Sequence, residues 1–263
     1  MAHPDGELGT ARAAAARGLT FAVSTSASTD LAEIAAVGGP RWFQVYLLAD
    51  PGARRALVER AVASGYEALV MTVDLARIGR RERDLRVGFR IPEGVEIPNV
   101  ALAAGVTPAE VASVAFVDRL TWTDLEWLAG FGLPVIVKGI LHPDDARLAI
   151  EHGAAGIGVS NHGGRQLDAS IASLDALPGV VEAVAGRVPV LLDGGVRRGI
   201  DVLIALALGA AAVGIGRPVV WGLAVDGEEG VGAVLDLLMR EFENAMALAG
   251  AATIADLTAD LLA

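Results

Sequence analysis

Short runs of apolar residues recur along the chain, and each is followed by a turn and an Ala- and Leu-rich stretch with helical spacing. Apolar runs rich in β-branched residues are typical of buried strands, and the stretches between them are typical of amphipathic helices. This alternation predicts a parallel sheet covered by helices. Strands are expected at Leu19–Ser24, Trp42–Leu47, Ala68–Val73, Pro134–Lys138, Gly156–Ser160, Val188–Asp193 and Ala212–Gly216.

Helices are predicted between these strands where the apolar spacing lengthens from two residues to three or four. A glycine follows several of them, which is the residue that a left-handed C-terminal cap requires. The predicted helices are Ala53–Ser64, Pro143–His152, Leu174–Ala185 and Gly199–Leu208, and the glycines are Gly65, Gly153, Gly186 and Gly209.

The continuous apolar strands indicate burial on both faces, which fits either a barrel or an open, doubly wound sheet. A polar residue at the end of nearly every strand favours the barrel, because the carboxyl ends of (β/α)8 strands converge on one face where active sites lie. We therefore expect an α/β fold, a TIM-type barrel with seven readable strands. The polar residues are Ser24, Tyr46, Asp74, Lys138, Ser160 with His162, Asp193, and Arg217.

Residues 80–119 break this rhythm, because they contain scattered prolines and show only weak periodicity. A long segment without secondary structure inside a compact domain is usually a functional lid or disordered. We expect a mobile loop here, within a single domain that spans residues 1–263.

Composition narrows the choice of partners. The 263 residues include 21 Lys and Arg, 32 Asp and Glu and no cysteine, for a net charge of −11. An acidic chain has no electrostatic affinity for nucleic acid or anionic membranes, and small molecules are the expected partners. The absence of cysteine excludes disulfides and thiolate zinc sites, and no metal site is predicted.

The longest uncharged apolar run, residues 202–216, is too short to span a membrane. The N-terminal residues lack the apolar core of a secretory signal. A cytoplasmic location is therefore expected.

The segment SNHGGRQLD, residues 160–168, directly follows a predicted strand. Its two glycines permit a tight turn that points His162 and Arg165 into one pocket. Histidine is a base near neutral pH, and arginine binds carboxylates in a bidentate manner. The alternative is a capped turn with two solvated side chains.

Two further strand ends carry charged residues. Asp74 is placed to orient His162 and stabilise its protonated form, although a helix N-cap is the more common role for an aspartate taken by itself. Lys138 follows a fully apolar strand, where it either serves the site or extends to solvent. Their shared position on the rim favours a role in the site.

The last two strands end in glycines followed by arginines. In barrels, the loops after strands seven and eight often bind phosphate. Glycines that merely end the strands would not account for both arginines, so we favour a phosphate site. Its residues are Gly194, Gly195, Arg197, Gly216 and Arg217.

Together with SNHGGRQLD, the segments LLDGGVRRGIDVLIALALGA, GIGRP, FQVY and TVDLARIGRRERDLR closely resemble the FMN-dependent 2-hydroxy acid oxidases and dehydrogenases. This group contains glycolate oxidase, lactate oxidase and mandelate dehydrogenase. The resemblance covers nearly all of residues 3 to 257. It implies a flavoprotein oxidoreductase that converts an L-2-hydroxy acid to the 2-oxo acid.

The resemblance also implies roles for individual residues. His162 is implied as the catalytic base with Asp74 as its partner. Arg165 and Arg81 would bind the substrate carboxylate, and Tyr46 would hydrogen-bond a substrate oxygen. Lys138 is implied beside the flavin N1/O2 edge, where a cation stabilises the reduced ring. Other implied FMN contacts are Ser24, Gln44, Thr72, Ser160, Asp193, Gly194, Gly195, Arg197, Gly216 and Arg217.

The sequence departs from the family pattern in two places. Ser26 stands where the family commonly has an aromatic residue, which leaves the identity of the substrate open. Family members also carry a segment ahead of AHPDGEL that includes the first barrel strand. A barrel without that strand exposes the edges near Leu19 and Ala212, which favours association into a homo-oligomer.

Two other functions remain at this point. One is an FMN barrel enzyme of different chemistry. The other is an incomplete barrel that acts only as a binding or assembly subunit. The acceptor that reoxidises the flavin, oxygen or another compound, is open.

Overall fold

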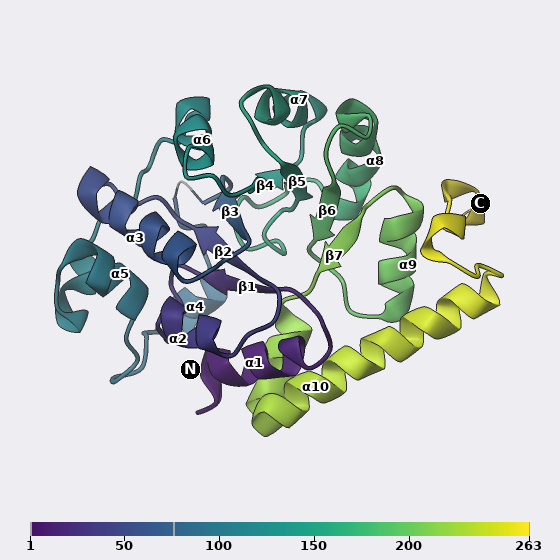
Figure 1. The fold of residues 1–263 in the computed structure, drawn as a ribbon. Helices are drawn as coiled ribbons and strands as arrows, with labels where there is room; N and C mark the ends of the chain where they lie inside the picture. Colours follow the sequence, from purple (N-terminus) through teal and green to yellow (C-terminus); the bar gives the residue numbers. More distant parts are fainter. Residues whose placement is uncertain (1, 76, 263) are drawn as a thin grey trace.

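The computed structural model describes residues 2–75 and 77–262, and in it seven parallel strands form one sheet with helices on its outer side (Figure 1). The strands pair in chain order, from β1 at one edge to β7 at the other. They are β1 Phe21–Ser24, β2 Arg41–Val45, β3 Ala68–Thr72, β4 Val135–Ile140, β5 Gly156–Val159, β6 Val190–Asp193 and β7 Ala212–Gly214. The seven predicted strands are confirmed, with ends that differ by no more than two residues.

Strands β3 and β5 are buried at every position, as their continuous apolar sequences predict. Such strands need cover on both faces, and helices supply it on the outside. The principal helices are α1 Gly6–Ala15, α2 Leu31–Ala36, α3 Pro51–Ala63, α6 Trp122–Ala129, α7 Pro143–Glu151, α8 Ser173–Val184, α9 Gly199–Ala207 and α10 Arg217–Leu248.

The helix boundaries follow from local sequence. Helix α3 begins where the Asp50 side chain accepts a hydrogen bond from the Ala53 N–H, and Pro51 occupies its first turn. It ends before Gly65, whose φ of 73° only glycine adopts without strain. The four predicted helices are confirmed by α3, α7, α8 and α9.

The core lies between the sheet and the helices. Phe43 on β2 packs edge-to-face against Tyr66, with the ring centroids 5.6 Å apart. The buried Tyr66 hydroxyl donates a hydrogen bond to the Leu31 carbonyl at the start of α2. A buried hydroxyl without a partner would be costly, so this bond fixes α2 against the sheet.

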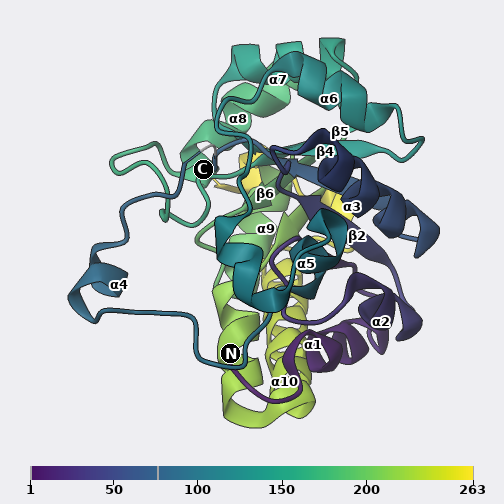
Figure 2. The same cartoon turned by 90° about the vertical axis from the view of Figure 1, so that its left-hand side faces the viewer.

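The weak periodicity of residues 80–119 suggested a segment without secondary structure, but this segment contains three short helices. They are α4 Glu82–Arg86, α5 Pro98–Ala104 and the 3-10 helix η1 Pro108–Ser113. Buried Asn99 anchors α5, because its side chain accepts from the Leu31 N–H and donates to the Thr29 carbonyl. Helices of five to seven residues are too short to produce a periodic signal. Of these three short helices, α4 lies farthest from the rest of the molecule (Figure 2).

Helix α1 lies alongside α10 across the bottom of the view in Figure 1. Arg17 joins the two through bonds of 2.6 and 2.8 Å to Asp236. The sheet itself stays open between β1 and β7, so the seven strands form a half-barrel, consistent with a truncated TIM barrel. The 3-10 helices η2 Ile254–Asp256 and η3 Ala259–Leu262 follow α10. Among the described helices, none combines the length and apolarity that a membrane crossing requires.

Candidate active site

Asp74 and His162 meet at the carboxyl ends of β3 and β5. The His162 Nδ1 lies 3.0 Å from Oδ1 and 3.2 Å from Oδ2 of Asp74. Both side chains are largely buried, with 20% and 14% exposed for the histidine and the aspartate. A carboxylate at Nδ1 holds the proton on that nitrogen and leaves Nε2 as the free base.

The backbone at His162 has an uncommon conformation. Its φ is 58°, and Gly163 and Gly164 follow with φ of 67° and 72°. Three successive left-handed residues turn the chain sharply after β5. The His162 N–H donates to the Ser160 Oγ over 3.0 Å, which fixes the turn. A non-glycine residue in this region is strained, and such strain concentrates at functional sites.

Gly139 makes room for Asp74. The pairing of β4 with β5 shifts register between Lys138 and Ile140, and Gly139 at this bulge has a φ of 111°. A Cβ there would lie 2.8 Å from the Asp74 Cβ and 2.9 Å from its Cγ. Only glycine therefore lets Asp74 approach β4 this closely.

Lys138, Ser160 and Asp193 form a second polar cluster, across the ends of β4, β5 and β6. The Lys138 ammonium donates to the buried Ser160 Oγ over 3.0 Å and lies 3.4 Å from the Asp193 Oδ2. The Ser160 hydroxyl donates in turn to the Asp193 Oδ1 over 2.6 Å. Ser160 thus connects the lysine, the aspartate and the His162 backbone.

Ser24, Gln44 and Thr72 form a hydrogen-bonded row across the ends of β1, β2 and β3. The Ser24 hydroxyl donates to the Gln44 Oε1 over 3.1 Å, and the Gln44 Nε2 donates to the Thr72 Oγ1 over 3.0 Å. The row presents amide and hydroxyl groups at the same rim as Lys138. Such groups recognise the polar edge of a heterocycle.

Tyr46 follows β2 and packs edge-to-face on Phe116, with the ring centroids 6.2 Å apart. Burial, and secondarily the nearby Asp74 carboxylate, raises the pKa of Tyr46 to about 12, an effect that Arg81 partly opposes. The phenol is therefore a neutral hydrogen-bond donor at physiological pH. Asp74 and Arg81 are thus the two charged side chains that act on the Tyr46 phenol.

Arg81 and Arg165 differ in how far they enter this neighbourhood. The Nε of Arg81 is buried and has no hydrogen-bond partner among the described residues. A buried unpaired guanidinium nitrogen is costly, and an anionic ligand would satisfy it. Arg165 is exposed, and within the described part of the chain its side chain makes no ion pair.

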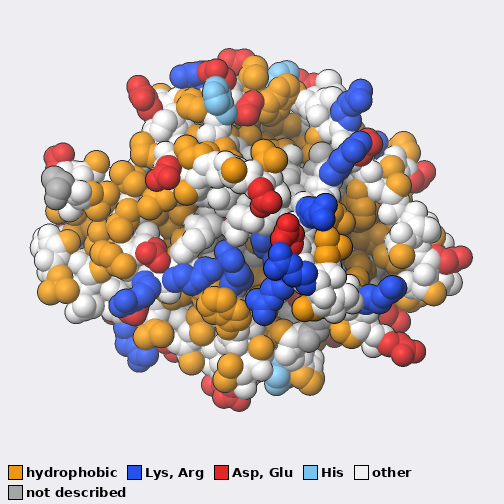
Figure 3. Space-filling model, turned by 180° about the vertical axis from the view of Figure 1, so that it is seen from behind, with side chains coloured by type: hydrophobic (Ala, Val, Ile, Leu, Met, Phe, Trp, Pro, Cys, Tyr) orange, Lys and Arg blue, Asp and Glu red, His pale blue; other side chains and the backbone are white. Residues whose placement is uncertain are grey.

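Basic side chains gather on the face that carries α4. Figure 3, which views the molecule from the back of Figure 1, shows Lys and Arg side chains concentrated across the middle of this face. The chain as a whole has a net charge of −11, so the local excess of positive charge is distinct from the rest of the surface. A positive surface around a site attracts anions and raises their association rate.

The ends of β6 and β7 provide backbone donors and two arginines. Gly194 and Gly195 have φ of 99° and 86°, and a Cβ at Gly195 or Gly216 would meet open space. Gly216 directly precedes α10, whose first N–H groups favour an anion. The Arg217 Nη2 donates to the Gly163 carbonyl over 3.0 Å, and Arg197 stacks on the Trp221 ring, with its Cζ 5.1 Å from the centroid.

Gln166 is a residue of this site that the sequence reasoning did not identify. Its Nε2 donates to the Asp74 carbonyl over 2.8 Å and to the Arg77 carbonyl over 3.2 Å. Its Oε1 accepts from the Gly79 N–H over 3.3 Å. One side chain therefore joins the loop after β3 to the loop after β5. Only its place in the SNHGGRQLD segment signalled it.

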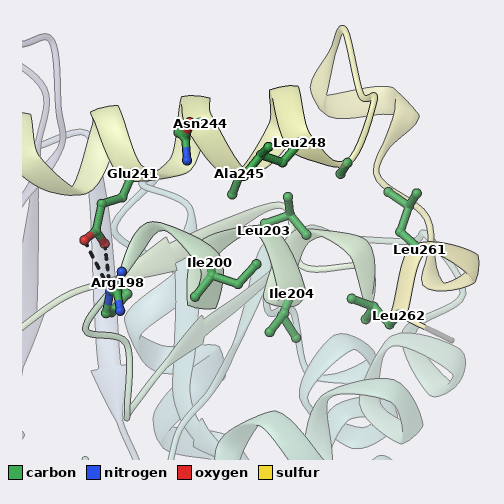
Figure 4. A pocket seen from close by; sticks show the side chains of 11 residues that line it. Arg198, Ile200, Leu203, Ile204, Glu241, Asn244, Ala245, Leu248, Leu261 and Leu262 are labelled. Atoms are coloured by element: carbon green, nitrogen blue, oxygen red, sulfur yellow. Dashed lines mark hydrogen bonds and ion pairs between the residues drawn. The ribbon is translucent and has the colours of Figure 1, made fainter.

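A separate groove of about 440 Å³ lies between α9, α10 and η3 (Figure 4). Apolar side chains such as Leu203 and Leu248 line it, and the Arg198–Glu241 ion pair closes one end. It shares no residue with the rim described above, so it does not contribute to the site.

The family model described as FMN-dependent dehydrogenase matches residues 1–263. The chain belongs to this family. FMN is accordingly its cofactor, and the residues present fit that group. The rim carries donors for a heterocycle and the cation Lys138. Gly195 and Gly216 leave their backbone open to a phosphate.

Individual relatives of this chain are oxidases. An L-lactate oxidase of Nostoc sp. is 50% identical over 277 residues, which cover all of this chain and 76% of the relative. Glycolate oxidase 1 of Oryza sativa subsp. indica is 47% identical, with 98% and 73% of the two chains covered. A mandelate oxidase variant solved with (S)-mandelic acid superposes with a TM-score of 0.89 at 46% identity, covering 96% of this chain and 72% of the other.

Proposed function

We propose that this protein oxidises a small L-2-hydroxy acid to the 2-oxo acid with FMN as the immediate electron acceptor. The observation that carries the proposal is the Asp74–His162 pair at 3.0 Å, held at the rim beside Tyr46 and Arg81. The family and its lactate, glycolate and mandelate oxidases favour this chemistry over a different flavin reaction or a purely structural subunit.

His162 is the base in this proposal. Asp74 occupies its Nδ1, so Nε2 takes the proton from the substrate hydroxyl or Cα, and the carboxylate stabilises the imidazolium that forms. Oxidation removes two hydrogen nuclei and two electrons from the substrate in total. One of the two nuclei leaves as the proton that His162 takes. Bound FMN supplies the acceptor for the hydride equivalent.

Arg81 and Tyr46 orient the substrate. The buried Arg81 Nε binds the carboxylate, and the neutral Tyr46 hydroxyl donates to a substrate oxygen. Arg165, exposed on the adjacent loop, is proposed as a second cation for the same carboxylate. These contacts hold the Cα against the acceptor, which converts binding energy into rate.

The remaining rim residues hold the cofactor. Lys138 is proposed beside the ring, where its charge favours the reduced form. The phosphate is assigned to the start of α10 and the neighbouring glycines. The residues proposed to hold FMN are Ser24, Gln44, Thr72, Lys138, Ser160, Asp193, Gly194, Gly195, Arg197, Gly216 and Arg217.

Three features of the protein's setting belong to the same proposal. Oxygen or another acceptor reoxidises the flavin, the chain forms a homo-oligomer, and the cytoplasm is its compartment. The open edges at β1 and β7 support association, because unpaired strand edges favour contacts between chains.

The test is the visible spectrum of the protein reconstituted with FMN and mixed without air with lactate, glycolate or mandelate. Both enantiomers of lactate and mandelate are compared. Bleaching of the flavin band by one L-acid, with formation of the 2-oxo acid, is the expected result. A folded, flavin-loaded protein that none of these acids reduces would contradict the proposal.

A further inference from the structure

Trp221 is an exposed aromatic residue that the proposed chemistry does not use. It lies in the first turns of α10, and 54% of its surface is accessible to solvent. Exposed aromatic rings are common on protein surfaces, but this one carries a cation. The Arg197 Cζ stands over the ring, 5.1 Å from the centroid. The pair therefore joins the loop after β6 to the start of α10.

Arg197 is held in place at its backbone and along its side chain. Its N–H donates to the Asp201 Oδ2 over 2.8 Å, and its Nη1 donates to the Val196 carbonyl over 3.0 Å. Within the described part of the chain, its Nε and Nη2 make no hydrogen bond and its guanidinium forms no ion pair. Two nitrogens and the full positive charge are thus available to a ligand.

Three other arginines of the described chain lie over aromatic rings, and each is engaged in a further way. Arg54 and Arg55 also pair with carboxylates. Arg41 donates through both Nη1 and Nη2 to backbone carbonyls. Among these four stacked arginines, Arg197 alone combines an aromatic support with an unpaired charge and a free terminal nitrogen.

The next residue in the chain shows the other way to hold an arginine. Arg198 pairs with Glu241, and its Nε lies 3.2 Å from the Oε1 of that carboxylate (Figure 4). A carboxylate orients a guanidinium but neutralises its charge, whereas the face of an aromatic ring orients it and leaves the charge in place. The support that Trp221 gives to Arg197 is therefore the kind that an anion site requires.

The surroundings of the pair also favour an anion. A Cβ at Gly195 or Gly216 would meet open space, so the backbone on both sides is accessible. The first N–H groups of α10 lie about one turn before Trp221. A guanidinium carries its N–H groups in one plane, and a phosphate accepts two of them at once.

We propose that Trp221 is a positioning residue for the cofactor phosphate. Its ring holds Arg197 toward the phosphate, and this support increases the preference of the site for FMN over riboflavin, which is the same flavin without the phosphate. The role rests on the proposed function, which assigns the FMN phosphate to these strand ends. Trp221 acts through Arg197 and contacts neither the flavin ring nor the substrate.

The test compares the dissociation constants of FMN and riboflavin, measured by flavin fluorescence in buffer without phosphate. Trp221→Leu should weaken FMN binding about three- to fivefold and leave riboflavin binding unchanged, because only the phosphate contact loses its support. Trp221→Phe keeps an aromatic face and should retain most of the preference. Val225→Ala, at an exposed position on the same helix, is the control and should bind both flavins as the parent does.

Two further variants show whether Trp221 acts through Arg197. Arg197→Met should weaken FMN binding about tenfold or more, with no comparable effect on riboflavin. Trp221→Leu added to Arg197→Met should cause no further loss, since the ring then has no cation to hold. Urea unfolding establishes that each variant is folded under the conditions of the titration.

Four results would overturn the inference: a parent protein without preference for FMN, unchanged FMN binding in Trp221→Leu, an equal loss for riboflavin, or an additive loss in the double variant. A selective loss in Arg197→Met without one in Trp221→Leu refutes the role of Trp221 and leaves the phosphate assignment standing. No substrate is present in these titrations, so their outcome is independent of the proposed oxidation.

Discussion

The Gln166 side chain holds the Asp74 backbone in place, with its Nε2 donating to the Asp74 carbonyl over 2.8 Å. The carboxylate of the same aspartate orients His162, four residues before Gln166 in the chain. The loop that carries His162 and Gln166 therefore contacts Asp74 twice. The His162 ring contacts the Asp74 carboxylate, and the Gln166 amide contacts the Asp74 carbonyl. The site depends on the relative position of two loops, and Gln166 fixes that position.

Replacement of Gln166 by Leu should therefore lower kcat by about 10- to 100-fold, because the two loops lose their common hydrogen bonds and misplace the base. Gln166→Asn retains the amide on a shorter side chain and should recover only part of the loss. Steady-state kinetics on protein that its urea-unfolding curve shows to be folded separates this role from simple destabilisation. A parent-like kcat in Gln166→Leu would refute the role.

Gly139→Ala should displace Asp74, because the new Cβ would lie 2.8 Å from the Asp74 Cβ. Overpacking of this kind costs about 1–3 kcal/mol, in addition to the strain of a left-handed alanine. Gly132→Ala is the matched control, since Gly132 has a φ of 82° but no atom near the added Cβ. Urea unfolding of both variants isolates the contact, and equal losses of stability in the two would show that Asp74 has room to move.

The two tyrosine hydroxyls should lose their protons at a higher pH in the folded protein than in the unfolded chain. The chain has only two, Tyr46 and Tyr66. Burial raises the pKa of Tyr46 to about 12 and raises that of Tyr66 as well. A raised folded pKa gives stability that is complete below the unfolded value of 10.0 and is lost as pH rises through the folded value. Little phenolate absorbance should develop below about pH 11, and stability should fall between pH 10 and about pH 12. Ordinary titration near pH 10 in folded protein would contradict the burial of Tyr46.

Arg81→Lys should raise KM for the hydroxy acid about tenfold or more, because an ammonium cannot make the paired contact of a guanidinium. Its effect on kcat should be smaller if Arg81 mainly binds the substrate. Arg83→Lys is the control, since Arg83 is exposed on the same helix. An unchanged KM in Arg81→Lys would exclude Arg81 from substrate binding.

Much of the fold could be predicted because strands such as β3 and β5 are buried along their whole length and are apolar throughout. The polar residues at the rim of the sheet could be predicted as well, because each of them follows directly at the end of an apolar run. The helix α5 could not, because its seven residues are too few to show a helical period, and the hydrogen bonds of buried Asn99 reach residues far away in the sequence.

The missed parts of the site involve contacts between residues distant in sequence. Gln166 and Asp74 are 92 positions apart, and the role of Gly139 depends on the bulge in β4 and on the neighbouring β3 loop. Apart from the place of Gln166 in the SNHGGRQLD segment, no local pattern marks either residue. Arg165, which the sequence predicts to share a pocket with His162, is exposed in the structure, and its contact with the substrate stays a prediction.

The most direct test of the central claim is the rate of anaerobic flavin reduction in His162→Ala, loaded with FMN and mixed with the acid that reduces the parent protein. The account predicts that bound FMN is retained and that the reduction rate falls by about 10²- to 10⁴-fold, since the base is lost and the cofactor contacts remain. Reduction at the parent rate would contradict the assignment of His162, and with it the proposed mechanism.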